Sequence, residues 1–74
     1  MSHTLREVEP KTEQTRHLIR RVHAEYAEMP GLSLTMPQAQ RLFGIDSQTC
    51  AVVLNTLIVR GFLRRTLKGT YVRV

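Results

Sequence analysis

The 74-residue sequence has few of the residues that build covalent or metal-held sites. Its one cysteine, Cys50, cannot form a disulfide within the chain, and no second Cys or His stands beside it as a metal ligand. His3 lies far from the other two histidines, and His17 and His23 fall on different sides of a helix. No Ser/His/Asp or Cys/His arrangement and no glycine-rich phosphate loop is present. We therefore expect no metal, no cofactor and no catalytic activity.

Long apolar runs are also missing. The longest, Cys50 to Val59, is interrupted by Asn55 and Thr56 and is shorter than the roughly 18 residues that a membrane span needs. The first residues lack the apolar segment of a secretory signal. With a single cysteine, these features predict a soluble protein of a reducing compartment, the cytoplasm, without membrane contact. A chain of this size has room for one modest core, so we expect no small-molecule ligand.

Acidic residues are scarce in the second part of the chain. The net charge is +5, and the five cations of residues 1–28 are balanced by five carboxylates. Residues 29–74 carry six cations against Asp46 alone. A charge gathered on one part of a small domain attracts polyanions, although an ordinary solvated surface would also account for it.

The sequence predicts a flexible arm over residues 1–11 and one domain over residues 12–74. Thr12 is the expected N-cap of a first helix, which Pro30 and Gly31 end. Its charged face, which includes an Arg21/Glu25 pair at i,i+4 spacing, reads as a solvated surface. The apolar residues at helical spacing form its buried face: Leu18, Ile19, Val22, Tyr26 and Met29.

Two further helices and a short strand follow. Leu32–Leu34 alternates as a strand does, and Thr35 with Gln38 forms a capping box for the second helix. Ala39, Leu42 and Phe43 are expected on the inner face of that helix, Gly44 ends it, and Ile45 fills the turn. Asp46 caps a third helix that runs to about Arg60, where Gly61 and Phe62 fit a Schellman motif.

Residues 62–74 predict a β-hairpin around a turn that contains Gly69. A lone hairpin is barely stable, so it needs the strand at Leu32–Leu34 as a neighbour. The fold class is therefore α+β, with three helices, a short strand and a C-terminal hairpin. Thr35–Phe43, the Gly44–Asp46 turn and the Arg60–Thr66 passage resemble the winged helix-turn-helix superfamily, in particular small bacterial winged-helix DNA-binding proteins. The resemblance implies a recognition helix in the DNA major groove and a hairpin, the wing, along the phosphate backbone.

The third helix presents an uncharged outer face, for which two interpretations remain open. In the first, this face reads DNA bases: amides bind adenine and small apolar side chains contact thymine methyl groups. In the second, it is an apolar surface for a protein partner or a second copy of the chain. The candidates for base contacts are Ser47, Gln48, Thr49 and Asn55, and those for a protein interface are Ala51, Val52 and Val59.

The cations of the hairpin favour DNA. Arg64, Arg65, Lys68 and Arg73 fall within ten residues, with Thr66 and Thr70 as possible hydroxyl donors. Such a hairpin can lay guanidinium groups against phosphates, although cations also protect edge strands. We expect these four residues and Arg41 to contact phosphates, and Arg60 to act through the helix dipole. The sequence thus predicts a transcription regulator or an accessory to one.

Overall fold

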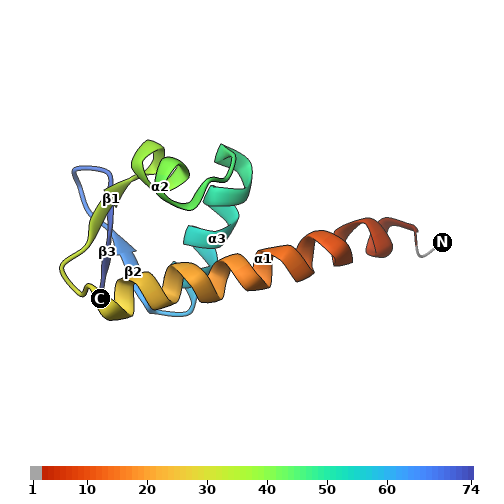
Figure 1. Cartoon of the computed structure of the whole chain (residues 1–74), viewed down its shortest axis with the longest axis horizontal. Coiled ribbons are helices and arrows are strands. Elements are labelled where there is room, and N and C mark those ends of the chain that lie inside the picture. The colour runs from red at the N-terminus through yellow and green to blue at the C-terminus, as the bar shows by residue number, and fades with distance from the viewer. Residues whose placement is uncertain (1–2) are drawn as a thin grey trace.

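The structure, a computed structural model, describes the backbone of residues 3–74 and the side chains of residues 13–74. It is α+β, as expected: three helices and a small antiparallel sheet of three strands. The described chain is elongated, with principal extents of 44 × 20 × 20 Å. The helix α1 runs along one side of the molecule and projects past the other elements at its N-terminal end (Figure 1).

The helix α1 spans His3–Glu28, so the expected start after Thr12 is wrong. Pro10, which removes one backbone donor, suggested a boundary that the helix does not have. The residues that precede Pro10 include Leu5, Glu7 and Glu9, which are good helix formers. The helix therefore continues through the region that was expected to be a flexible arm. The side chains of residues 1–12, and with them His3, lie outside the described part.

The buried face of α1 follows the expected stripe except at its end. Ile19, Val22 and Tyr26 are buried and Leu18 packs against them, but Met29 is half exposed because it follows the last helical turn. The hydroxyl of Tyr26 donates a buried hydrogen bond of 2.8 Å to the backbone carbonyl of Tyr71. This bond ties the C-terminal end of α1 to the sheet.

The helix α2, Met36–Phe43, is capped as predicted. The Thr35 side chain accepts from the Gln38 amide, and the Gln38 side chain accepts from the Thr35 amide. Gly44 ends the helix in the left-handed region at φ 66°. Ala39 and Phe43 are buried as expected, but Leu42 is half exposed. Leu42 therefore lies at the margin of the buried face of α2.

The helix α3, Ser47–Val59, also has both predicted ends. The Asp46 side chain accepts from the Thr49 amide at 2.7 Å. At the other end, Gly61 adopts φ 80°, and the amides of Gly61 and Phe62 donate to the carbonyls of Ile58 and Leu57. These two bonds are the Schellman pattern. Gly61 therefore turns the chain directly from α3 into the sheet.

The three strands are β1 (Ser33–Thr35), β2 (Leu63–Arg65) and β3 (Thr70–Arg73). Their order is β1-β3-β2, so β1 supplies the neighbour that the hairpin needs. The register places Leu34, Tyr71 and Arg65 side by side. Since Leu34 and Tyr71 are buried, this row faces the helices, and the neighbouring row with Arg64 faces away.

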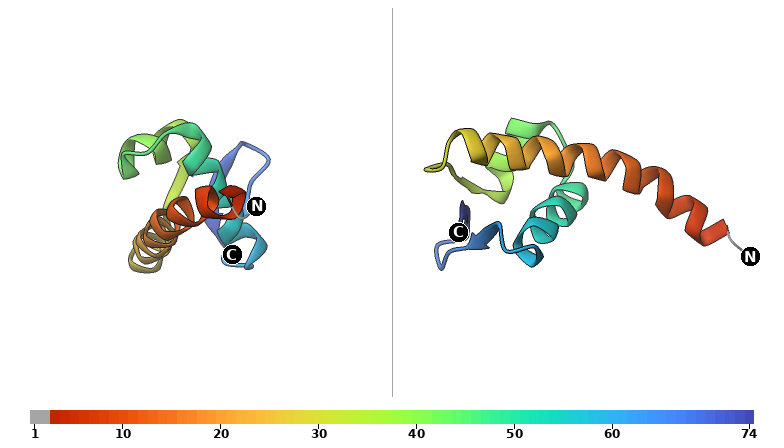
Figure 2. Two further views of the ribbon diagram at one scale, coloured as in Figure 1. Left: turned by 90° about the vertical axis from the view of Figure 1, so that its right-hand side faces the viewer. Right: turned by 90° about the horizontal axis from the view of Figure 1, so that it is seen from below.

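The core lies between the sheet and the three helices, with α3 packed across the middle of α1 (Figures 1 and 2). Cys50, Val53, Leu54 and Leu57 form the inner face of α3, as their spacing predicts, and Ile45 packs against the core from the turn. No single helix within the described residues is long and apolar enough to cross a membrane. The pair α2 and α3 passes that test only when taken together, and it is bent by 104°.

Candidate functional site

The outer face of α3 is exposed to solvent along its length. Gln48, Ala51 and Asn55 are exposed, Val52 is 49% exposed and Val59 is 77% exposed. A helix that buries one stripe on a core leaves the opposite stripe to solvent. We call these five residues the α3 stripe; it has no ionisable side chain. Of the two other candidates, Ser47 is exposed at the first turn, and Thr49 is half buried.

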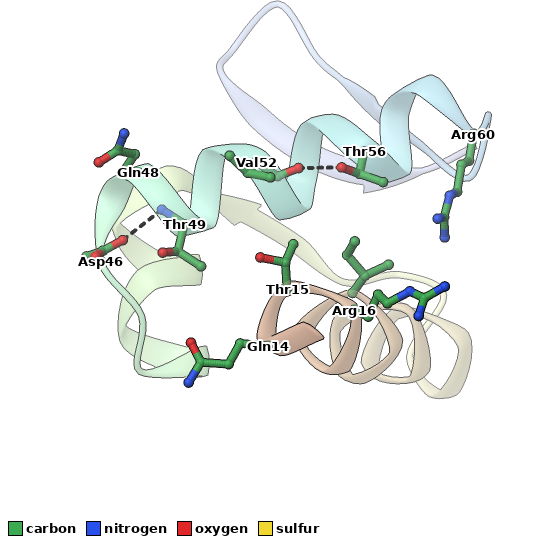
Figure 3. Close-up of a pocket in the computed structure, with 10 residues that line it drawn as sticks. Gln14, Thr15, Arg16, Asp46, Gln48, Thr49, Val52, Thr56 and Arg60 are labelled. Carbon is green, nitrogen blue, oxygen red and sulfur yellow. Dashed lines mark hydrogen bonds between the residues drawn. The ribbon is translucent and has the colours of Figure 1, made fainter. Parts of the chain in front are cut away.

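One side of the α3 stripe borders a groove between α3 and α1, which we call the α1–α3 groove (Figure 3). Its volume is about 660 Å³. From α3 it is lined by Gln48, Val52 and Arg60, and from α1 by Thr15 and Arg16. The full set of lining residues also includes Gln14, Ile19, Asp46, Thr49 and Thr56. Thr49 therefore faces α1 rather than the centre of the open stripe.

The ends of the α1–α3 groove differ in charge. Asp46 lies at the N-terminal end of α3, where its carboxylate accepts from the Thr49 amide. Arg60 lies at the C-terminal end, and its guanidinium reaches down toward α1 on the side where Arg16 lies (Figure 3). Each charge opposes the partial charge of the helix end beside it. The cationic end of the groove is thus the end that attracts anions.

The other side of the α3 stripe borders a hollow between α3 and the sheet, the α3–sheet hollow. From α3 it is lined by Ala51, Val52 and Asn55, and from the sheet by Arg65 and Tyr71. Met36 and Ile58 complete it. Val52 lines this hollow and the α1–α3 groove, so it marks the ridge between them. Arg65 is the cation that the sheet brings beside the stripe.

The four hairpin cations do not share one surface. Arg64 and Arg65 are both exposed, but they are adjacent in a strand and lie on opposite faces of the sheet. Lys68 is exposed in the turn between β2 and β3. The Arg73 guanidinium lies over the Phe62 ring, 5.1 Å from its centroid. Only Arg65 lines a hollow beside α3.

The Phe62 ring stacks against two partners, and the Arg73 guanidinium is the first. Its other contact is the ring of His23 on α1, at 3.8 Å between centroids and 15° between planes. Arg73, Phe62 and His23 thus connect the last strand to α1. This stacking holds the Arg73 head near Phe62, where a cation–π contact contributes about 0.5–1 kcal/mol at an exposed site.

The turn of the hairpin uses the hydroxyl groups that were candidate phosphate donors. The Thr66 and Thr70 side-chain oxygens are 2.7 Å apart and share a hydrogen bond, and the Thr70 amide donates to the Thr66 oxygen. Gly69 closes the turn at φ 86°. Leu67 at its tip is fully exposed. Thr66 and Thr70 therefore stabilise the turn.

Two arginines have positions that the sequence did not reveal. Arg60, expected to act only through the dipole of α3, joins Arg16 and Arg20 of α1 around one small hollow. Arg21, expected to pair with Glu25, instead donates to the Phe43 carbonyl at 3.4 Å, and its guanidinium lies 5.6 Å from the Phe43 ring centroid. Arg21 thus binds the C-terminal end of α2. Arg41 is exposed on the last turn of α2 and lines neither hollow.

The described residues contain no group of three or more His, Cys, Asp or Glu that could hold a metal ion. Cys50 is 1% exposed, and burial, with a smaller contribution from Asp46, raises the pKa of its thiol. A buried thiol with a raised pKa is a poor nucleophile. Cys50 therefore acts as a small core residue, as its position on the inner face of α3 predicts.

Comparisons of the chain with protein-family models, with curated proteins and with solved structures found no match.

Proposed function

We propose that this chain is a winged helix-turn-helix domain that binds double-stranded DNA, as a transcription regulator or an accessory to one. In this proposal α3 enters the major groove and the hairpin β2–β3 is the wing. The observation that carries it is the open, uncharged α3 stripe with Arg65 at its edge. A helix in the major groove needs a polar or small outer face toward the bases and cations at its flanks toward the phosphates.

The order of the elements supports this assignment. A helix, a strand, two helices and a hairpin follow one another, and the first strand pairs with the last. The sheet lies at the C-terminal end of α1 (Figure 1), and α3 packs against both α1 and β2. This order of elements is typical of the winged-helix superfamily, which residues Thr35–Phe43 and Arg60–Thr66 also resemble.

The chemistry of the α3 stripe fits base edges. Gln48 and Asn55 each offer an amide that donates to and accepts from adenine N7 and N6. Ala51 and Val52 offer small apolar surfaces for thymine methyl groups. All four are exposed. We therefore assign them to the base-facing side, with Ser47 at the start of the helix.

The phosphate contacts of the wing fall to Arg65 and Lys68 first. Arg65 lies beside the stripe, and Lys68 lies in the turn that projects from the sheet. Arg41 and Arg64 are exposed but lie away from both hollows, and Arg73 is stacked on Phe62. No wing cation forms an ion pair within residues 13–74, so none is neutralised by the described carboxylates.

A binding assay with random-sequence duplex DNA tests the proposal. Fluorescence anisotropy of a labelled duplex should show binding that weakens steeply between about 50 and about 200 mM salt. The double variant Arg65→Gln with Lys68→Gln should lower the slope of log K against log salt by about two. Wild-type protein that leaves the duplex unbound at the lower salt concentration refutes the proposal.

The exposed valines support a second candidate function, a protein-interaction or dimerisation module. Val52 and Val59 are 49% and 77% exposed on the same stripe. If a second copy covers them, size-exclusion chromatography should show a concentration-dependent dimer that Val52→Asp abolishes. The first candidate instead predicts a monomer elution position unchanged by Val52→Asp and a loss of DNA binding in that variant, because the new carboxylate would face phosphates and bases.

A further inference from the structure

Three arginines from two helices surround a hollow beside the C-terminal end of α3. Arg16 and Arg20 come from successive turns of α1, and Arg60 is the C-cap of α3. Ile19, buried between them, supplies the apolar floor. We call this the arginine hollow. It opens into the α1–α3 groove, with which it shares Arg16, Ile19 and Arg60.

The arginine hollow concentrates positive charge, and no described carboxylate lies in it. Within residues 13–74 none of its three arginines forms an ion pair. Like charges on neighbouring side chains repel one another, so folding brings these groups together at a cost. An anion with several acceptor oxygens removes that repulsion, and phosphate suits the planar donors of arginine best.

The position of the arginine hollow relative to the α3 stripe indicates which DNA strand would supply the phosphates that bind there. The α1–α3 groove and the α3–sheet hollow lie on opposite sides of Val52. Arg65 therefore borders the stripe on the sheet side, and Arg16 and Arg60 border it on the α1 side (Figure 3). The major groove of B-DNA is about 12 Å wide and has one sugar–phosphate strand along each edge.

From this geometry we infer that Arg16, Arg20 and Arg60 bind the phosphates of one DNA strand while Arg65 binds the phosphates of the other. The inference rests on the proposed function and extends it, because the wing then holds only one edge of the groove. A helix of about 10–12 Å diameter fills the major groove, so both of its flanks meet phosphates.

The test is the salt dependence of duplex binding by the triple variant Arg16→Gln, Arg20→Gln and Arg60→Gln. Each lost phosphate contact lowers the slope of log K against log salt by about one, so we expect a decrease of about three. All three side chains are exposed, and circular dichroism should show that the fold is unchanged. The variant Arg16→Gln alone, with an expected decrease of about one, gives the same test with the smallest change in sequence.

Two controls complete the experiment. The variant with lysine at the three positions keeps the charge and should keep a slope close to that of the wild type. Arg64→Gln removes one charge from the face of the sheet that points away from the helices, and its slope should stay unchanged.

The outcomes separate the inference from the proposed function. If the wild type binds duplex DNA and the triple glutamine variant keeps its affinity and slope, the arginine hollow does not contact DNA, while the proposed function stands. If the wild type binds no duplex, the proposed function fails and the inference fails with it. A decrease in the triple variant that adds to the decrease of the Arg65 and Lys68 variant supports two independent edges.

Discussion

At the scale of single residues, Tyr26 has a strongly raised pKa. It is fully buried, and its hydroxyl donates to the Tyr71 carbonyl. Burial, followed by the charges that Cys50 and Tyr71 acquire on ionisation, raises its pKa from 10.0 to about 12. We expect absorbance at the tyrosinate wavelength to report one tyrosine titrating near pH 12, and Tyr26→Phe to lose that phase.

The same pKa sets an alkaline limit on stability. Because the folded-state pKa lies above the unfolded value, the stabilisation is complete below pH 10 and is lost as the pH rises toward 12. The two-unit shift corresponds to about 3 kcal/mol of unfolding free energy. Urea denaturation at pH 9 and at pH 11.5 should show a smaller drop in Tyr26→Phe than in the wild type. An equal drop in both proteins would contradict the assignment.

Arg64 and Arg65 form a matched pair for the DNA proposal. They are adjacent and exposed, carry the same charge and differ in the face of the sheet that they occupy. Since only Arg65 lies beside the α3 stripe, Arg65→Gln should weaken duplex binding by about three- to fourfold or more at about 200 mM salt. Arg64→Gln should leave the affinity nearly unchanged. Equal losses in an anisotropy titration would mean that the hairpin meets DNA in another orientation.

At the scale of elements, the N-cap of α3 decides how firmly the α3 stripe is held. Asp46→Ala removes the acceptor of the Thr49 amide and should lower the unfolding free energy by about 1 kcal/mol. Asp46→Asn keeps a capping oxygen and should cost much less. Ser47→Ala, one residue further on and exposed, is the control for general effects at this turn. Thermal melts in which Asp46→Ala and Ser47→Ala coincide would exclude a stabilising cap.

Elements that depend on local chemistry were predictable from the sequence, and those that depend on tertiary placement were not. The capping box at Thr35, the Asp46 cap and the Gly61 turn follow from neighbouring residues, and each has its predicted hydrogen bonds. The start of α1 was wrong because Pro10 is a statistical boundary that a helix can cross. Leu42 was misplaced because the period of a short helix does not fix which way its face turns.

The candidate site divides in the same way. The open face of α3 follows from its helical period, since the buried stripe fixes the exposed one. Strand alternation puts Arg64 and Arg65 on opposite faces of the sheet, but which of them faces α3 depends on the register of the hairpin, which the sequence left undetermined. The meeting of Arg16 and Arg20 with Arg60 depends on how α3 crosses α1, across some 40 residues of chain that contain no signal for it.

At the scale of the whole molecule, arginines flank the uncharged α3 stripe on both sides. Arg65 lies on one side of the α3 stripe, and Arg16, Arg20 and Arg60 lie on the other. A surface that contacts the phosphates of both strands across a wide major groove should distinguish B-form DNA from A-form RNA. The major groove of A-form RNA is deep and narrow and does not admit a helix.

Competition between the two duplexes is therefore the strictest test of this arrangement. An RNA duplex of matched sequence should compete at least tenfold more weakly than the DNA duplex for the wild-type protein at about 200 mM salt, because phosphates on both strands cannot be reached at once. The triple glutamine variant keeps only the proposed contacts of Arg65 and Lys68 with one strand. It should discriminate less between the DNA and RNA duplexes, since one row of phosphates is available in either duplex. A wild-type protein that binds both duplexes equally would show that attraction to phosphates alone, without insertion of α3, accounts for its binding.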